Sequence, residues 1–371
     1  MAVPRHRSKR WMLGFAALAM LAAAPVAMAD RAMAARPDEI PPPGATPQAK
    51  PQPKPQARPV STTPLAVPAS SVDPKAAQAQ RLKRVNAARS WGYQLAGLDV
   101  EEAARSPFDL IVVDVTSGLA SGRHFLPAEV ERLKKKPDGS RRLVVSYLSV
   151  GEAEDYRPDY FTAEYMTEDA PDWLGPENPQ WKGNRVIRFC HEGWQRTILG
   201  DDNGRNVYNS IDPSPLYRLI ELGFDGIYLD RVDVYNDVRK ECPDGEKKMV
   251  DFVARLALHA RKRDPAFIVV LQNAEELVRS PKMMDTIDAI AKEDLFYGAD
   301  HSQNPNSAAS ISEALGHLKA VKAAGRPVFV VDYLIAAPKK EDARRRISAE
   351  GFIPYIAPRD LGRLWLPGKD F

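Results

Sequence analysis

The sequence contains few of the residues from which metal sites and disulfide frameworks are built. Its 371 residues include two cysteines, Cys190 and Cys242, and six scattered histidines. Two cysteines exclude a disulfide-dense scaffold and a cysteine-based zinc cluster. The histidines show no H-E-x-x-H or similar spacing. The sequence therefore predicts no metal site, and no motif in it indicates a cofactor.

Strong net charge and nucleotide-binding motifs are absent as well. The formal charge of +3 by itself indicates neither a nucleic acid nor a membrane as a partner. No G-x-G-x-x-G follows the first candidate strand, which argues against a dinucleotide-binding fold. No G-x-S-x-G is present either, so a serine nucleophile of the α/β-hydrolase type is not supported.

The first thirty residues have the pattern of a secretory signal. Basic residues between Arg5 and Arg10 precede an apolar run that ends in the small-x-small site "AMA" at 27–29. This pattern predicts a cleaved signal over residues 1–29, with an uncleaved membrane anchor as the alternative. Cleavage would leave no segment for stable membrane insertion. We therefore expect an exported protein, periplasmic or extracellular.

A proline-rich segment follows the signal. Residues 37–74 hold 12 of the 32 prolines, which cannot donate ladder hydrogen bonds and which favour extended polyproline II. Few apolar side chains are present there to offset the entropy of ordering the chain. We therefore expect a disordered or semi-rigid linker over residues 30–81 and a folded domain over residues 82–371.

Short β-rich runs alternate with helical segments in the folded part. Several runs are continuous in Val, Ile and Leu, which is typical of strands buried on both faces of a parallel sheet. Residues 247–263 and 311–324 show the apolar stripe of amphipathic helices, and Gly325 fits a helix C-cap. Nine candidate strands lie at 93–96, 110–115, 143–150, 185–189, 226–230, 267–273, 288–294, 328–333 and 352–357.

Repeated strand–helix units of this kind predict an α/β fold, a (β/α)8 TIM barrel, with an open doubly wound sheet as the rival. Nine candidate strands exceed the eight of a barrel by one. The segments at 93–96 and 352–357 fit the strand pattern least well.

Polar residues stand at six successive strand ends, which in a barrel meet in one shared site. A single carboxylate after a strand is more often a helix N-cap than a catalyst, but six such ends together predict a carboxylate-rich cleft. The residues are Asp114, then Tyr147 and Glu152 with Glu154 and Asp155 just beyond, Asp230 and Asp233, Gln272 and Asn273, Glu293 and Asp294, and Asp332 and Tyr333.

A cleft of carboxylates, amides and tyrosines without histidine suits the chemistry of sugars. A glycosidase needs one carboxylic acid to protonate the leaving oxygen and a second carboxylate as nucleophile or base. Close carboxylates push their pKa values apart, which assigns acid and base. Tyr147, Tyr228, Trp173 and Trp181 are candidates for stacking on sugar rings, with ordinary packing as the alternative. Carboxylates also hold hard cations, so a metal-dependent hydrolase such as a deacetylase is a further alternative.

The two cysteines have two possible states. Cys190 follows one candidate strand, and Cys242 lies in the loop after the next. Both would then lie near the same face of a barrel, where an exported protein could pair them. The alternative is two reduced thiols.

Seven strings along the domain resemble glycoside hydrolase family 114, the endo-α-1,4-polygalactosaminidase-like family, over residues 85–366. The resemblance implies a (β/α)8 barrel that hydrolyses galactosamine-rich exopolysaccharide from within the chain. The strings are "SWGYQLAG", "VVSYLSVGEAEDYRPDYF", "GFDGIYLDRVDVYN", "IVVLQNAEEL", "AIAKEDLFY", and "VFVVDYL" with "GFIPYIAPRDL". One departure from the pattern is Cys190-His191, where an aromatic and an acidic residue are expected.

The resemblance also implies roles for residues. Asp230 matches the nucleophile and Glu293 the acid/base of a retaining mechanism, and the reverse order stays open. Extra carboxylates would counter the charge of a cationic galactosamine, although Asp233 fits a cap or a supporting group better. The sugar contacts expected from the resemblance are Asp114, Tyr147, Glu152, Asp233, Gln272, Asn273, Asp332 and Tyr333.

The expected partner is a polysaccharide, an amino-sugar polymer, acted on by a monomer without nucleic acid. Two alternatives remain at this point: a glycosidase of the same barrel with another polysaccharide substrate, and a non-catalytic carbohydrate-binding barrel.

Overall fold

The computed structural model describes residues 73–115, 124–155, 157, 170–205, 213–366 and 368. All of them lie in one compact unit that spans residues 62–371. The predicted signal at 1–29 and most of the predicted linker fall outside the described residues. Among the helices that are described, none is long and apolar enough to cross a membrane.

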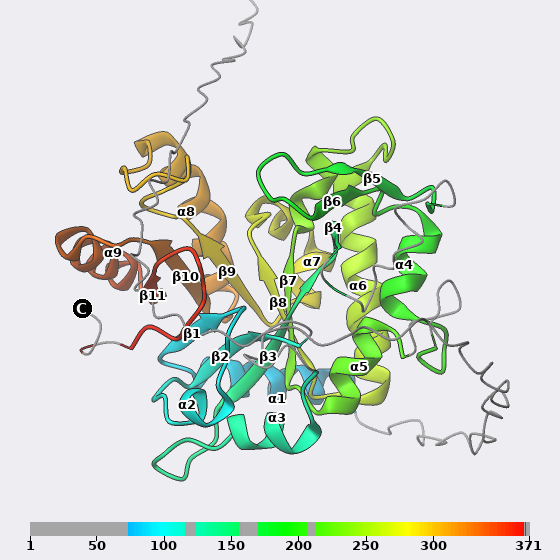
Figure 1. Cartoon of the computed structure of the whole chain (residues 1–371). Coiled ribbons are helices and arrows are strands. Elements are labelled where there is room, and N and C mark those ends of the chain that lie inside the picture. The colour runs from blue at the N-terminus through cyan, green and yellow to red at the C-terminus, as the bar shows by residue number, and fades with distance from the viewer. Residues whose placement is uncertain are drawn as a thin grey trace, which may run out of the picture. The chain divides into compact units, whose positions relative to one another are not determined.

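Eight parallel strands form a nearly closed barrel, as the alternation of strands and helices predicts (Figure 1). Each strand pairs with the next in the order β1 Trp91–Gln94, β2 Leu110–Asp114, β3 Leu143–Ser149, β7 Gly226–Asp230, β8 Ile268–Gln272, β9 Ala289–Glu293, β10 Val328–Tyr333 and β11 Ile353–Ala357. A side chain links the two outermost strands, since the Trp91 indole N–H donates to the carbonyl oxygen of Ile353 at 3.0 Å. The (β/α)8 prediction is confirmed.

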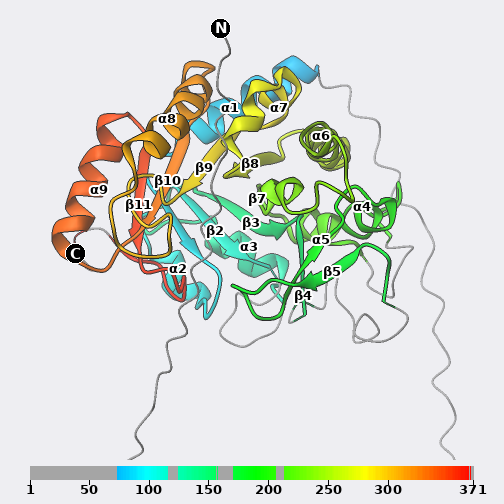
Figure 2. The same ribbon diagram turned by 90° about the horizontal axis from the view of Figure 1, so that it is seen from above.

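Helices surround the strands, and Figure 2 shows the ring from above. In α6 the predicted apolar stripe is buried, Met249 and Leu256 included, and Gly325 after α8 takes a left-handed φ of 75°. The α-helices are α1 Pro74–Asn86, α2 Val100–Ala104, α3 Pro127–Leu133, α4 Glu192–Leu199, α5 Pro215–Leu222, α6 Gly245–Arg263, α7 Pro281–Thr286, α8 Ala308–Ala323 and α9 Ala337–Ala349. The described residues also include the short 3-10 helices η2 Val232–Asn236 and η3 Glu275–Arg279.

Helix α1 lies partly in the segment expected to be a linker, so that expectation is wrong for residues 74–81. The Asp73 carboxylate accepts a hydrogen bond from a backbone N–H of the first turn at 3.1 Å, and Pro74 occupies the first helical position, where proline is well tolerated. Arg81 then forms a buried ion pair with Asp288 at 3.0 Å. Proline composition alone did not show where the proline-rich stretch gives way to a capped helix.

The surplus ninth strand belongs to a second, smaller sheet. This sheet consists of β4 Glu152–Glu154, β5 Leu174–Glu177 and β6 Asn184–Ile187. Its strands pair antiparallel in the order β4-β6-β5. The candidate at 185–189 is therefore a strand but not a barrel strand, whereas the two weakest candidates both lie in the barrel as β1 and β11. A strand pattern does not say which sheet the strand will join.

Aromatic side chains fill the inside of the barrel. The rings of Trp91, Tyr93, Tyr228, Phe329 and Tyr355 are at most 3% exposed and lie 5.1 to 6.3 Å from one another in pairs. Tyr228 is therefore core packing and not a platform for sugar. These packed rings occupy the interior of the barrel, so the carboxyl ends of the strands remain as the place for a site.

Candidate active site

A cavity of about 590 Å³ opens at the carboxyl ends of the barrel strands. Its size lies within the usual range for small-molecule sites, roughly 300–1,000 Å³. Nine of the ten predicted site residues line it: Asp114, Tyr147, Glu152, Asp230, Asp233, Gln272, Asn273, Glu293 and Tyr333. The strand-end interpretation of the sequence therefore located one shared cavity.

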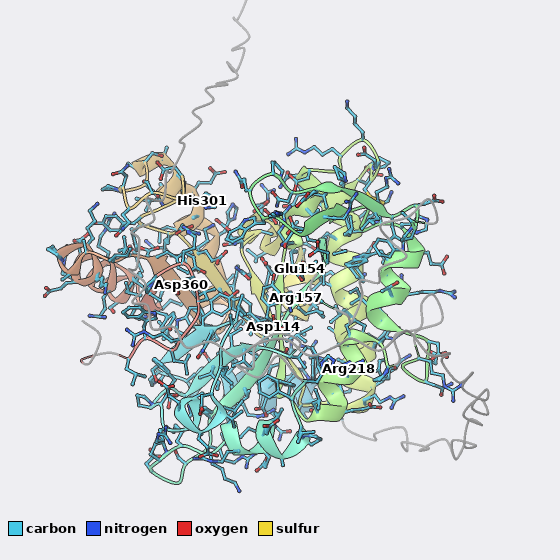
Figure 3. All side chains as sticks on the ribbon, viewed as in Figure 1. Asp114, Glu154, Arg157, Arg218, His301 and Asp360 are labelled. Carbon is cyan, nitrogen blue, oxygen red and sulfur yellow. A yellow bond between two sulfur atoms is a disulfide. The ribbon has the colours of Figure 1, made fainter. Side chains whose placement is uncertain are left out.

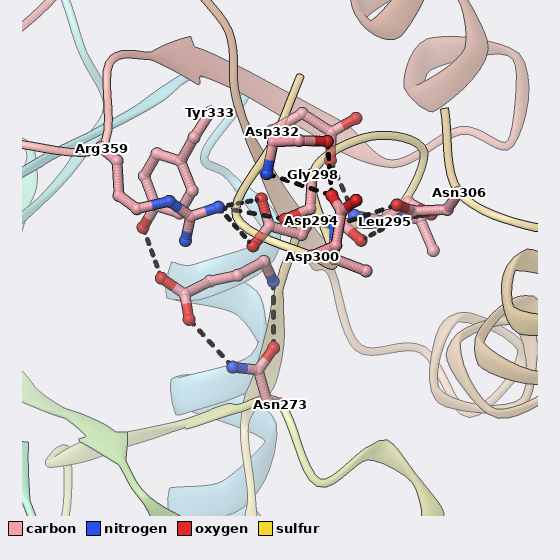
Figure 4. Close-up of polar contacts among 12 residues, drawn as sticks. Asn273, Asp294, Leu295, Gly298, Asp300, Asn306, Asp332, Tyr333 and Arg359 are labelled. Atoms are coloured by element: carbon pink, nitrogen blue, oxygen red, sulfur yellow. Dashed lines mark hydrogen bonds and ion pairs between the residues drawn. The ribbon is translucent and has the colours of Figure 1, made fainter. Parts of the chain in front are cut away.

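Asp332 is the exception, and the expectation that it contacts a sugar is wrong. Side chains alternate between the two faces of a strand, and Val331 pairs with Glu293, so Tyr333 shares the inward face while Asp332 points outward. Its buried carboxylate accepts hydrogen bonds from the backbone N–H of Leu295 at 2.7 Å and of Phe296 at 3.3 Å (Figure 4). Asp332 thus fixes the turn that follows β9.

Asp230, the last residue of β7, is held by two donors. The Tyr147 hydroxyl donates to Oδ2 at 2.7 Å, and the backbone N–H of Arg231 donates to Oδ1 at 2.7 Å. Burial first, and then the charge of nearby Glu293, raise the pKa of Asp230 to about 7, against the opposing hydrogen bond from Tyr147. Two carboxyl groups that interact in this way titrate as a pair.

Glu293, the last residue of β9, is oriented in the same manner. The Asn273 side-chain amide donates to Oε2 at 2.9 Å, and the Tyr333 hydroxyl donates to Oε1 (Figure 4). The Asn273 amide oxygen accepts the backbone N–H of Glu293 at 3.0 Å. Within the described residues, neither Asp230 nor Glu293 forms an ion pair, so both carboxylates are held by neutral groups and remain available for reaction.

The backbone turns sharply where three neighbouring strands end. The residues directly after β7, β8 and β9 are Arg231, Asn273 and Asp294, and their φ angles are 55°, 54° and 52°. This left-handed conformation is uncommon for residues other than glycine, and it concentrates at functional sites. Each turn lets the last strand residue point into the cavity while the chain leaves it.

A buried arginine supports the Tyr147 side of the site. The Arg157 guanidinium pairs with Asp114 at 2.5 Å and with Glu154, and all three side chains are at most 4% exposed. The guanidinium also lies 4.8 Å from the centre of the Tyr147 ring. Figure 3 shows Glu154, Arg157 and Asp114 close together near the centre of the barrel. Asp114 therefore lines the cavity with its carboxylate bound to a cation of the protein itself.

A second arginine organises the neighbouring wall. Glu152 is 1% exposed and pairs with Nε of Arg231 at 2.9 Å. The same guanidinium pairs with Asp233 at 3.2 Å. Burial raises the pKa of Asp233, while Arg231 opposes the rise. Glu152 and Asp233 thus serve to hold Arg231, whose backbone N–H orients Asp230.

Cations of the cavity are what the sequence reasoning missed. Lys292 pairs with Glu275 at 3.3 Å, and Arg359 pairs with Asp294 at 2.7 Å (Figure 4). Burial nonetheless raises the pKa of Asp294 to about 6. The sequence does carry a signal for these cations, because each is adjacent to a strand end or to a carboxylate. The strand-end pattern of carboxylates does not include them.

The cavity carries an excess of acidic groups. Among the described residues, its lining holds nine carboxylates: Asp114, Glu152, Glu154, Asp230, Asp233, Glu275, Glu293, Asp294 and Asp360. Four cationic side chains line it as well: Arg157, Arg231, Lys292 and Arg359. The excess of five acidic groups favours a cationic ligand. Across the described part of the chain, no group of three His, Cys, Asp or Glu side chains is placed to hold a metal ion.

The two candidate tryptophans lie in different environments, and the two cysteines are paired. Trp173 is 3% exposed and packs on Trp194 with ring centroids 4.9 Å apart, so it belongs to the core. Trp181 lines the cavity. Cys190 and Cys242 form a disulfide with their Cα atoms 5.9 Å apart, which excludes the alternative of two reduced thiols in this structure.

Comparison with known proteins gives a family match over nearly all of the folded part. The model of the glycoside-hydrolase family GH114 matches residues 71–368. An uncharacterized protein of Methanocaldococcus jannaschii is 32% identical over 295 residues, which cover 74% of this chain and 79% of the relative. An uncharacterized protein of Deinococcus radiodurans is 33% identical over 287 residues, which cover 76% of this chain and 84% of the relative.

Two solved structures share the fold. The glycoside hydrolase domain of PelA from Pseudomonas aeruginosa aligns with a TM-score of 0.55 at 21% identity, covering 74% of this chain and 97% of that domain. Aspergillus fumigatus Ega3, solved in complex with galactosamine, aligns with a TM-score of 0.53 at 18% identity. The alignment covers 75% of this chain and 94% of the Ega3 chain.

Proposed function

The chain belongs to glycoside-hydrolase family GH114, and we propose that it cleaves a galactosamine-containing polysaccharide with Asp230 and Glu293 as its catalytic pair. One observation carries the proposal. These two carboxylates face one cavity, the charge of Glu293 raises the pKa of Asp230, and among the described residues both are held by neutral donors. Six of the other seven described lining carboxylates are instead paired with internal cations.

The proposed reaction is a double displacement that retains configuration. Asp230 attacks the anomeric carbon while Glu293 protonates the departing glycosidic oxygen, which leaves a sugar bonded to Asp230. Glu293, now ionised, removes a proton from water, and the resulting hydroxide displaces Asp230. The pair thereby regains its one proton, and the bond has been hydrolysed.

The assignment of roles within the pair follows the family resemblance. It requires the shared proton to lie on Glu293 when substrate binds, although the pKa of about 7 at Asp230 places the proton there for part of the time in the free enzyme. Two donors to the Asp230 oxygens, Tyr147 and the Arg231 N–H, stabilise its ionised form. They support Asp230 as the nucleophile.

The substrate proposed is a polymer with free amino groups, cleaved at internal α-1,4 linkages. The acidic excess of the cavity supports binding of a protonated amino sugar, and Ega3, which shares the fold, was solved with galactosamine. Since most lining carboxylates already have partners, this preference comes from the summed field and from the pair itself more than from unpaired counter-charges.

Export is proposed on the pattern of residues 1–29, and the disulfide of the folded part supports an oxidising compartment such as the periplasm or the exterior. We propose a monomer as the working form, because one chain supplies both catalytic carboxylates and the groups that hold them.

Reducing-end release from deacetylated and N-acetylated galactosamine polymers tests the proposed function. Wild type should release ends from the deacetylated polymer, and Asp230→Asn and Glu293→Gln should each lose at least about a hundredfold in kcat/KM. Asp251→Asn is the matched control, since Asp251 is partly exposed and pairs, among the described residues, with Lys247 and Lys282 on the outer helices. Binding without release in all variants would instead indicate a carbohydrate-binding barrel.

Azide rescue distinguishes the roles of the two carboxylates. With Glu293→Ala and a substrate that has a good leaving group, azide should give a glycosyl azide of retained configuration, because the covalent intermediate still forms on Asp230. With Asp230→Ala, azide should give the inverted product. The opposite pattern of products would reverse the two roles.

A further inference from the structure

Trp181 is an exposed aromatic side chain inside the cavity wall. It is 47% exposed and lines the same cavity as Asp230 and Glu293. Leu126, Leu258 and Ile335 are the other large apolar side chains with high exposure in the described residues, and they do not line that cavity. An indole held in water at a site costs free energy that a bound ring would recover.

The turn that carries Trp181 is fixed by backbone and partly buried side-chain hydrogen bonds. It joins β5 to β6, and the backbone N–H of Asn184 donates to the Trp181 carbonyl at 3.0 Å. The side-chain amides of Asn178 and Asn184 donate to the two oxygens of buried Glu152 at 2.7 and 2.8 Å. The backbone that carries Trp181 is therefore in place before any ligand binds, which lowers the entropy cost of binding.

A second ring faces Trp181 from the opposite wall. His301 lies in the segment between β9 and α8, where Figure 3 shows it near α8, and it also lines the cavity. Its backbone N–H donates to the Gly298 carbonyl at 2.8 Å. The centres of the two rings are 6.4 Å apart at an interplanar angle of 56°. The two walls thus bring one indole and one imidazole together at the rim of the cavity.

We propose that Trp181 forms a separate subsite for the polysaccharide chain, in which a galactosamine ring beyond the bond being cleaved stacks on the indole face and His301 borders the ring. This rests on the proposed function. The indole offers an apolar face to the C–H groups of a sugar and attracts a nearby ammonium group through a cation–π interaction. Its effect should therefore depend on chain length and be larger for free amines than for acetamides.

A series of galactosamine oligosaccharides of increasing length tests this subsite. For long oligosaccharides, Trp181→Ala should raise KM by about five- to thirtyfold, from loss of one cation–π and stacking contact. For the shortest oligosaccharide that is cleaved, KM should match that of wild type. Trp181→Phe should fall between the two. Leu258→Ala, which removes an exposed apolar side chain outside the cavity, should equal wild type at all lengths.

Binding to an inactive background separates the two proposals. Calorimetry with Glu293→Gln, with and without Trp181→Ala, should show weaker binding of long oligosaccharides only in the double variant. If wild type cleaves these sugars but Trp181→Ala changes KM equally at all lengths, the subsite is wrong and the proposed function stands. If wild type neither binds nor cleaves any galactosamine oligosaccharide, the proposed function is wrong and the subsite falls with it.

Discussion

The protonation of Asp230 is set by its immediate surroundings. Burial and the charge of Glu293 raise its pKa from 3.8 to about 7, and Tyr147 and Arg231 oppose that rise. Because the folded state raises this pKa, protonated Asp230 stabilises the fold below pH about 4, and that contribution is lost as the pH rises to about 7. The same shift would give the proposed catalytic pair a proton to donate near neutral pH.

Activity should therefore depend on pH in a defined direction. We expect kcat/KM to fall as the pH rises through about 7, because the pair then loses the proton that the leaving group needs. In Glu293→Gln the neighbouring charge is gone, so the pKa of Asp230 should be lower than in wild type. Carboxyl 13C shifts of Asp230 measured against pH in both proteins would check this. A pH-independent kcat/KM between pH 5 and 9 would contradict the shared proton.

The sequence predicted which residues would meet at one cavity where only strand ends mattered, and it failed to do so where strand register mattered. Asp230, Gln272 and Glu293 end consecutive strands and meet in one cavity. Asp332 also lies near a strand end. Because it directly precedes the inward-facing Tyr333 on the same strand, its side chain points out of the barrel. The ion pair of Arg157 with Asp114 was not predictable, because 43 residues separate the partners in the sequence.

At the scale of elements, the small sheet and the loops around it form one wall of the site. Glu152 begins β4, Trp181 lies between β5 and β6, and Cys190 follows β6. The disulfide from Cys190 reaches Cys242, in the connection that begins after β7 with Arg231. His191, the other departure from the family pattern, caps α4 by accepting the backbone N–H of Gly193 at 3.0 Å.

Removing the disulfide should destabilise the fold and the active-site wall together. The bond closes a loop with a sequence separation of 52 residues, for which chain entropy gives about 4 kcal/mol of stabilisation. Cys190→Ser with Cys242→Ser should therefore lower the free energy of unfolding by several kcal/mol in urea titrations. Wild type treated with a reductant should match the double variant. Equal stability of oxidised and reduced wild type would contradict this prediction.

Element types were predictable from the sequence, but their partners were less so. The continuous apolar runs of β7 and β8 are strands of the barrel, as their composition indicates. The run at 185–189, which carries two arginines among its apolar residues, is also a strand, but it pairs antiparallel with β4 and β5. Sheet membership is decided by long-range pairing, which local hydrophobic pattern does not encode.

Over the whole molecule, charge is separated between the cavity and the rest of the chain. The full sequence carries a formal charge of +3, whereas the described residues that line the cavity include five more acidic than basic groups. A low-dielectric cleft with one sign of charge focuses its field and raises the local concentration of opposite charges. The near-neutral composition of the sequence therefore gave no indication of this local acidic excess, on which the proposed choice of substrate depends.

This separation predicts a salt effect that depends on the substrate. For the deacetylated polymer, kcat/KM should fall severalfold when ionic strength rises from 0.01 to 0.1 M, because the screening length shortens from about 30 to about 10 Å. The N-acetylated polymer lacks the charge, so any cleavage of it should change little. Asp360→Asn removes one exposed carboxylate from the lining and should make the dependence shallower. Equal salt responses for the two polymers would mean that the acidic excess does not select the substrate.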